Sequence, residues 1–414
     1  MQEEIIQHIE NPHQLEKLYR KNKTAFKKAF NTIYPQLQEN SIAQTWNQRL
    51  NFKSEEITVA SKNELLIIII ASLLAMLLAK IPEFTGIDEI FYYSRNVGFI
   101  IFPILTAYFA WRNNLHTRKL YVIIFSIIIS AIYINSLPEP EKSDSLLLTS
   151  IHLPLLLWSI LGFTFAGNEY NMYSRRLDYL RYNGELIIMT TIILIAGGIL
   201  TGITLGLFAL IDVEIYDFYF EYVVIWGLVA APIIGTYLLQ IVPQLVNKVS
   251  PVIAKVFTPL VLVTLIVYLI TLIGTGQNPY KDRDFLLIFN FLLLGVMAIV
   301  LFSIAGTTND EKGKASIFLL FSLSVVTIII NTIALTAILF RITEWGITPN
   351  RLAVLGGNAL MLANLLMVAY HLLNTIRNKN DIENVEKSIA QFLPIYAGWT
   401  IVVTFIFPFI FQFK

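Results

Sequence analysis

The chain of 414 residues has no cysteine and few charged side chains. The lack of cysteine excludes a disulfide framework, a thiol nucleophile, an iron–sulfur cluster and a thiolate metal site. The five histidines show no paired metal-ligand spacing, so we predict no metal and no cofactor. Charged residues make up 14% of the chain and hydrophobic residues 56%, which leaves too little polar surface to cover a soluble globule of this size. The composition therefore predicts an integral membrane protein, and a net charge of +1 argues against a nucleic-acid partner.

Residues 1–62 are polar and predict a helical domain in the cytoplasm, with no signal peptide expected. Asn11 and Pro12 form a cap and first turn for one helix, and Ser41 can cap a second. An apolar stripe follows these helices at a spacing of three and four residues; it contains Leu15, Leu18, Tyr19, Phe26, Ala29, Phe30, Ile33 and Trp46. This stripe needs a cover, which is either the packing of the two helices on each other or a protein partner.

Residues 63–414 consist of long apolar runs separated by short polar loops. A run of about 20 apolar residues crosses a hydrocarbon core of about 30 Å, and solid runs such as Leu65–Ile70 exclude a transmembrane β-barrel. We predict an all-α bundle of about eleven transmembrane helices. The spans are placed near 64–80, 96–111, 120–136, 145–166, 185–210, 219–243, 256–274, 285–306, 316–340, 353–375 and 391–412.

The basic residues predict the orientation of these spans. With the N-terminus in the cytoplasm, about thirteen Lys and Arg fall on inner loops and about eight on outer loops and ends. The N-terminal domain adds about nine more inside. The chain is therefore expected in an inner, cytoplasmic membrane, with Lys414 outside.

Small residues recur every four positions in the fifth and sixth predicted spans. Gly198, Gly202 and Gly206 form one such stripe, and Gly227, Ala231 and Gly235 form the other. Such stripes let two helix backbones approach closely, so we expect helix packing here. Pro232 lies in the second stripe and frees a backbone carbonyl, which makes a hinge or sliding surface the alternative.

The loop between the ninth and tenth predicted spans is a candidate ligand-binding loop on the outer side. It departs from the basic-inside trend, and its candidate residues are Arg341, Glu344, Trp345, Thr348, Asn350 and Arg351. Two guanidinium groups at a membrane surface can clamp a phosphate or carboxylate, such as a lipid headgroup. The alternative is an internal Arg–Glu pair beside a tryptophan anchored at the interface.

The inner loop at 167–185 interleaves tyrosines with arginines. Tyr179 lies among Arg175, Arg176 and Arg181, which is typical of a short amphipathic helix at an anionic leaflet with its rings at headgroup level. The expected partner of this segment is membrane lipid.

The run Arg175–Glu185, together with Trp345–Arg351, resembles the bacterial multi-pass membrane family catalogued as domain of unknown function 4153. The resemblance covers most of the membrane domain, with residues 1–62 as an added module. It implies a polytopic membrane protein without assigned chemistry, so no catalytic residue is carried over.

Three functions are compatible with this sequence. The first is a permease- or flippase-like transporter of a small solute or lipid, favoured by the span count, the glycine stripes and the helix prolines. The second is a membrane-embedded enzyme acting on lipid-linked envelope substrates, with Asp88, Glu89, Arg341 and Arg351 at the outer face. The third is a scaffold or sensor that docks a partner through residues 1–62. No sequence feature fixes the oligomeric state.

Overall fold

The chain forms two compact units, residues 1–59 and 60–414, each described here by itself. The computed structural model describes residues 1–21, 23–51, 62–138, 143–210, 213–242, 249–275, 280, 283–305, 314–377 and 382–413. The sequence placed the division at residue 62, which is the first residue of a helix; residues 52–61 lie outside the described part. Within the described ranges the chain is helical and contains no strand.

The N-terminal unit is a small helical domain with its own core. Its helices are α1 (Gln2–Gln7), α2 (Pro12–Lys21), α3 (Lys23–Ile33), the 3-10 turn η1 (Tyr34–Gln36) and α4 (Ser41–Asn51). Phe26, Phe30 and Trp46 are buried together with Ile5 and Leu15. The cover for the predicted apolar stripe therefore comes from the unit's own helices.

The helix caps of this unit follow the sequence at one position and differ at another. Asn11 Oδ1 accepts a hydrogen bond from the Gln14 amide at 3.2 Å, which confirms the predicted cap of α2. The cap of α4 is Asn40, whose Oδ1 accepts from the amides of Ile42 and Ala43 at 3.0 Å. Ser41 was the expected cap, and it is instead the first helical residue.

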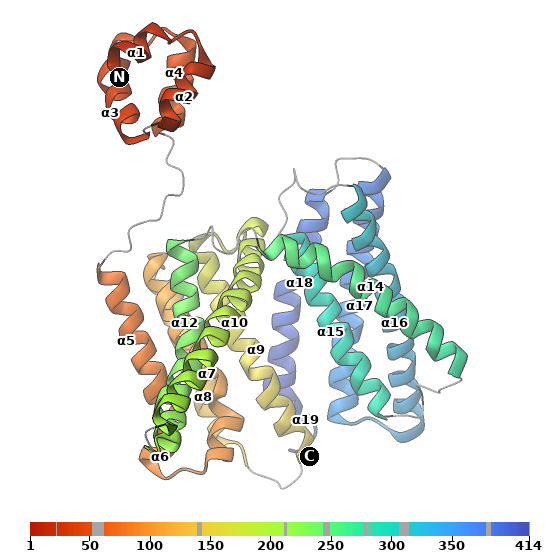
Figure 1. Cartoon of the computed structure of the whole chain (residues 1–414). Helices are drawn as coiled ribbons and strands as arrows, with labels where there is room; N and C mark the ends of the chain where they lie inside the picture. The colour runs from red at the N-terminus through yellow and green to blue at the C-terminus, as the bar shows by residue number, and fades with distance from the viewer. Residues whose placement is uncertain are drawn as a thin grey trace. The chain divides into compact units, whose positions relative to one another are not determined.

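The second unit is a bundle of long apolar helices (Figure 1). Its helical segments are α5 (Lys62–Ala79), α6 (Ile81–Thr85), α7 (Glu89–Arg112), α8 (Thr117–Ser136), α9 (Asp144–Ala166), η2 (Gly167–Glu169), α10 (Tyr173–Ala209), α11 (Tyr216–Phe218), the π-helical turn η3 (Tyr219–Val224), α12 (Ile225–Ile241), α14 (Val249–Thr275), α15 (Arg283–Ala305), α16 (Lys314–Trp345), α17 (Pro349–Arg377), α18 (Ile382–Ile401), the π-helical turn η5 (Val402–Ile406) and α19 (Phe407–Ile410). Among the described residues, eight segments are long and apolar enough to cross a membrane, and three shorter apolar helices lie in α5, α14 and α15. Each predicted span overlaps one of these helices.

Two cores meet on opposite sides of the first half of α10. Tyr179, Tyr182 and Met189 belong to a core shared with α5, α7, α9 and α12. Leu177 and Leu180 belong to a second core shared with α14 to α18. The spacing of three and four residues places each set on its own helix face. In Figure 1, α18 lies between a group containing α5, α7 and α12 and a group containing α14 to α17.

The short amphipathic helix predicted within 167–185 is wrong, because from Tyr173 onward this segment is the beginning of the 37-residue helix α10. Tyr179 and Tyr182 are buried at 3% and 4% exposure and do not lie on a surface at headgroup level. Their rings pack on Phe165 with centroid distances of 5.4 and 5.0 Å. Burial of these two rings stabilises the packing of α10 against α9, because each ring removes a large apolar area from solvent.

Candidate functional site

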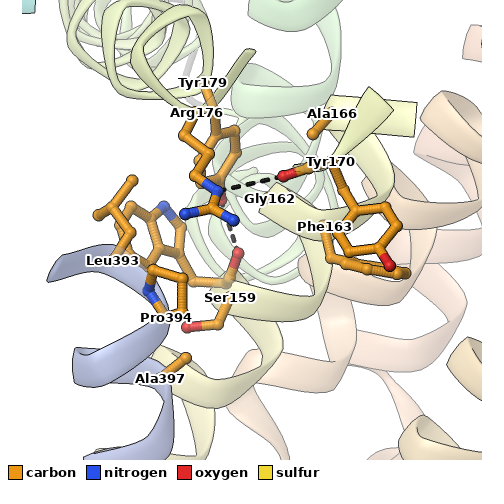
Figure 2. A pocket seen from close by; sticks show the side chains of 11 residues that line it. Ser159, Gly162, Phe163, Ala166, Tyr170, Arg176, Tyr179, Leu393, Pro394 and Ala397 are labelled. Carbon is orange, nitrogen blue, oxygen red and sulfur yellow. Dashed lines mark hydrogen bonds between the residues drawn. The ribbon is translucent and has the colours of Figure 1, made fainter. Parts of the chain in front are cut away.

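A cavity of about 320 Å³ lies where α9, α10 and α18 meet. The wall from α9 contains Trp158, Ser159, Gly162, Phe163 and Ala166; Tyr170 follows η2, Arg176 and Tyr179 come from α10, and Leu393, Pro394 and Ala397 come from α18. In Figure 2, Phe163 and Ala166 of α9 lie to the right of Arg176, and Leu393, Pro394 and Ala397 of α18 lie below it and to the left, with Ser159 of α9 beside Pro394. The lining is mostly apolar and aromatic, with Arg176 as its one charged residue. A concave apolar surface with one placed cation is the usual form of a site for a small amphiphilic molecule.

Hydrogen bonds between α9 and α10 hold the lining residues Trp158 and Tyr179 in place. The Tyr179 hydroxyl donates to the Trp158 carbonyl at 2.6 Å, and Trp158 Nε1 donates to Asn183 Oδ1 at 2.8 Å. Asn183 Nδ2 in turn donates to the Tyr179 carbonyl at 2.6 Å. A Cβ at Gly162 would lie 2.6 Å from the Tyr179 ring, so the close approach of this ring requires glycine at 162.

Arg176 lines the cavity and donates hydrogen bonds to two backbone carbonyls from different segments. Its Nε donates to the Tyr170 carbonyl at 3.1 Å, and its Nη1 donates to the Ala390 carbonyl of α18 at 3.2 Å. The guanidinium carries two more N–H groups on Nη2. Both bonds go to neutral acceptors, so the positive charge of Arg176 is not neutralised by them.

A second cation, Lys119, lies close to the cavity, beside its lining residue Tyr170. Lys119 Nζ is 4.3 Å from the centroid of the Tyr170 ring and donates to the carbonyls of Gly167 and Asn168 at 3.3 and 3.2 Å. The stacking of an ammonium group on an aromatic face stabilises this position. Lys119, like Arg176, is held by carbonyl oxygens.

The other arginines of the segment 167–185 have acidic neighbours. Arg175 Nε lies 3.1 Å from Glu169, and Arg181 Nη1 lies 3.5 Å from Asp178. These pairs are about half exposed and are worth about 1 kcal/mol or less each. Sequence reasoning grouped Arg175, Arg176 and Arg181 as lipid contacts; only Arg176 lines the cavity.

The α18 wall was not identified from the sequence, although a signal for it exists. Pro394 lies inside α18, and a proline within a helix leaves the carbonyl four residues earlier without its usual donor. That carbonyl belongs to Ala390, the acceptor of Arg176. A search of the sequence for carbonyls that lose their helix donor to a proline four residues later would have identified Pro394.

The candidate outer loop forms the turn between α16 and α17 and is held by backbone contacts. Arg351 Nη1 donates to the carbonyls of Trp345 and Gly346 at 2.9 and 2.7 Å, which satisfies groups at the end of α16. Gly346 has φ of 79°, a left-handed conformation that favours glycine. Thr348 Oγ1 accepts from the Arg351 amide at 3.3 Å and caps α17.

The remaining residues of this loop surround Trp345. The guanidinium carbons of Arg341 and Arg351 lie 5.2 and 5.8 Å from the centroid of its ring. Glu344 is exposed, and Asn350 is half-buried in the first turn of α17. The structure therefore brings both arginines to one tryptophan, and Arg351 closes the turn by bonding carbonyls.

The two glycine stripes do not face each other. A Cβ built at Gly198, Gly202, Gly206 or Gly227 meets no atom within 4 Å. At Gly235 it would lie 3.2 Å from Leu186 and from Thr190 of α10. The helices α10 and α12 thus approach closely at Gly235, as expected for the second stripe, and this contact lies on the first half of α10. The close packing expected at Gly198, Gly202 and Gly206 is not seen. Pro232 lies inside α12, and its carbonyl accepts from Thr236 Oγ1 at 2.8 Å.

Asp88 and Glu89, the acids considered for an enzyme, lie at the beginning of α7. Asp88 Oδ1 accepts from the Phe91 amide at 2.7 Å and caps α7, with Glu89 exposed beside it. Within the described ranges, no group of three His, Asp or Glu side chains is arranged to hold a metal ion.

Comparison with protein-family models, with curated proteins and with solved structures gives no match for this chain. The fold and the cavity together define a class, a polytopic helical bundle compatible with an integral membrane protein.

Proposed function

We propose that this chain is a permease- or flippase-like transporter of a lipid or another small amphiphilic solute, with the cavity at Arg176 as its binding site. The observation that carries the proposal is the cavity itself, an apolar recess between three helices with Arg176 in its lining. Such a recess suits a molecule with a hydrocarbon part and a polar end.

The proposed topology has eleven spans. The eight long apolar helices supply most of them, and the shorter apolar helices in α5, α14 and α15 supply the rest. The cytoplasmic N-terminus, the external C-terminus and the inner-membrane location belong to the same proposal, as does membership of the family catalogued as domain of unknown function 4153.

The topology is tested by cysteine accessibility, which is simple here because the chain has no cysteine. Single substitutions Gln38→Cys in the N-terminal unit and Glu344→Cys in the α16–α17 turn are labelled with a membrane-impermeant maleimide in intact cells and in lysates. We expect Glu344→Cys to react in intact cells and Gln38→Cys only after lysis. Labelling of both positions from the same side of the membrane would contradict eleven spans with this orientation.

Transport is tested by filling the cavity in the purified, reconstituted protein. Ser159→Trp should reduce the movement of a fluorescent lipid between leaflets of vesicles by at least about tenfold, a barrier change of about 1.4 kcal/mol. The matched control is Ser126→Trp on α8, because both serines are half-buried and bond their own preceding turn, at 2.9 Å to Leu155 and 2.8 Å to Val122. Equal lipid movement with wild type, Ser159→Trp and empty vesicles would contradict the transport proposal.

The enzyme alternative is weakened by the position of Asp88, since a carboxylate that caps a helix is already committed to a backbone amide. An envelope lipid and glycan profile altered by Glu89→Ala, Arg341→Ala or Arg351→Ala would restore it. The scaffold alternative is weakened by the closed core of the N-terminal unit. A stoichiometric partner lost on removal of residues 1–62 would support it.

A further inference from the structure

Arg176 replaces a hydrogen bond that Pro394 removes from α18. In an α-helix the Ala390 carbonyl accepts from the amide of residue 394, and that residue is proline, which has no amide hydrogen. Arg176 Nη1 from α10 donates to this carbonyl at 3.2 Å. The side chain therefore ties α10 to α18 at the place where α18 is weakest.

The same guanidinium lines the cavity, and its hydrogen bonds go to the neutral carbonyls of Tyr170 and Ala390. Two acids of the segment 167–185 are paired with other arginines, Glu169 with Arg175 and Asp178 with Arg181. The hydrogen bonds of Arg176 and of the nearby Lys119 go to carbonyl oxygens. Arg176 and Lys119, both bonded to neutral carbonyls, give this end of the cavity a positive potential, which favours the binding of an anion.

The apolar walls of the cavity indicate the chemistry of the uncharged part of the ligand. Trp158, Phe163, Leu393 and Ala397 present apolar surface, and Figure 2 shows Leu393, Pro394 and Ala397 lining one side beyond the guanidinium. A ligand that fills the cavity needs a hydrocarbon or aromatic body joined to a phosphate or carboxylate.

We propose that the cavity binds an anionic amphiphile whose phosphate or carboxylate takes the Arg176 guanidinium away from the Ala390 carbonyl. This inference rests on the proposed function, because it names the substrate class of that same cavity. A bidentate, charge-assisted pair with an anion is stronger than the single bond to a neutral carbonyl. Binding therefore unties α10 from α18 and leaves α18 free to bend at Pro394, which couples occupancy to helix movement.

Ligand class is tested with the full chain in nanodiscs by titrating dodecyl phosphate, dodecanol and inorganic phosphate. We expect dodecyl phosphate to bind at least tenfold more tightly than either other probe. Tight binding of phosphate alone would replace the amphiphile with a free anion, and equal binding of dodecanol would overturn the role of charge.

Arg176→Gln should weaken dodecyl phosphate binding at least tenfold. Arg175→Gln is the matched control, since Arg175 is the neighbouring arginine paired with Glu169 and does not line the cavity; it should change binding by less than twofold. Equal losses in both variants would mean general surface attraction and overturn the site.

The release of α18 is measured by amide hydrogen exchange in the segment 386–397. Dodecyl phosphate should raise exchange there in the wild type. In Pro394→Ala the new amide bonds the Ala390 carbonyl directly, so at ligand concentrations adjusted to the same occupancy as in the wild type the ligand-induced rise should disappear. A rise of the same size in Pro394→Ala would overturn the coupling.

The two proposals fail in different ways. Arg176-dependent binding without lipid movement in vesicles contradicts transport and leaves the binding site standing. Lipid movement that is unchanged in Arg176→Gln contradicts the anionic-amphiphile site and leaves transport standing.

Discussion

The hydroxyl of Tyr133 donates to the carbonyl of Thr404 at 3.1 Å, joining α8 to the turn η5. The amide that would bond this carbonyl in an α-helix belongs to residue 408, which is proline. Thr149 Oγ1 from α9 lies 3.3 Å from the same carbonyl. The last helical segment is thus held at its irregular turn by side chains from two other helices, as Arg176 holds α18 at Pro394.

Tyr133→Phe should lower the free energy of unfolding by about 1 kcal/mol, the usual contribution of one hydrogen bond. The control is Tyr121→Phe on the same helix, an exposed position where we expect no measurable change. Thermal unfolding in one detergent compares both variants. In a Pro408→Ala background the cost of Tyr133→Phe should shrink, because the new amide can bond Thr404; an undiminished cost would contradict this account.

Gly356→Ala should destabilise the bundle by about 1–3 kcal/mol. A Cβ at this position would lie 2.0 Å from Trp399 Cζ2, and the indole ring is itself packed edge-on against Phe407 at a centroid distance of 5.9 Å. Gly202→Ala is the matched control, because no atom lies within 4 Å of its Cβ. It should be neutral or stabilising by up to about 1 kcal/mol, since alanine favours a helix. A destabilised Gly202→Ala would show that the stripe packs against another molecule.

Glu64→Gln should cost about 2 kcal/mol of unfolding free energy, the range for a buried hydrogen bond to a charged group. Glu64 is 9% exposed, accepts from the Tyr108 hydroxyl at 2.7 Å and pairs with Arg112, which joins α5 to α7. The comparison variant is Glu89→Gln, an exposed acid expected to change stability by less than about 0.5 kcal/mol. Equal stabilities from chemical denaturation would contradict a structural role for Glu64.

The N-terminal unit should lose stability in acid through Glu16. The hydrogen bond from Arg20 lowers the pKa of the Glu16 carboxyl below its usual value, with a further bond from Arg49 acting in the same direction. Because the folded pKa is depressed, the stabilisation is present above the unfolded pKa near 4.3 and is lost as the pH falls through the lower folded value. For partly exposed pairs the effect is about 1 kcal/mol or less.

Amide exchange of segments 12–21 and 41–50 in the full chain, corrected for intrinsic rates, measures this loss between about pH 3 and 6. Glu16→Gln should show weaker protection at pH 6 and no extra loss on acidification. A wild-type profile that follows that of Glu16→Gln at every pH would contradict the assignment.

Several local features were predictable because they depend on short-range chemistry. The cap at Asn11 follows from a side chain that reaches its own helix amides. An asparagine amide within an apolar helix is expected to bond to another helix, and Asn358 Nδ2 of α17 donates to Asn290 Oδ1 of α15 at 3.0 Å. Asn331 Nδ2 donates to the Asn358 carbonyl at 3.1 Å. In an apolar interior such groups have few other partners.

Features that depend on distant segments were not predictable. Tyr179 has the same local sequence whether it lies at a lipid surface or in a core, and only the neighbouring α9, with glycine at 162, decides for the core. The spacing of Gly198, Gly202 and Gly206 is compatible with packing or with an open face, and the direction of α12 leaves the face open.

The sequence by itself determined that this chain is helical and apolar, since hydrophobic runs of membrane length can satisfy their backbone only as helices in lipid. The tertiary structure alone decided where its chemistry lies. Arg176 and Pro394 are more than 200 residues apart, and they become one site only because α10 and α18 pack together and a side chain of one supplies the hydrogen bond missing from the other.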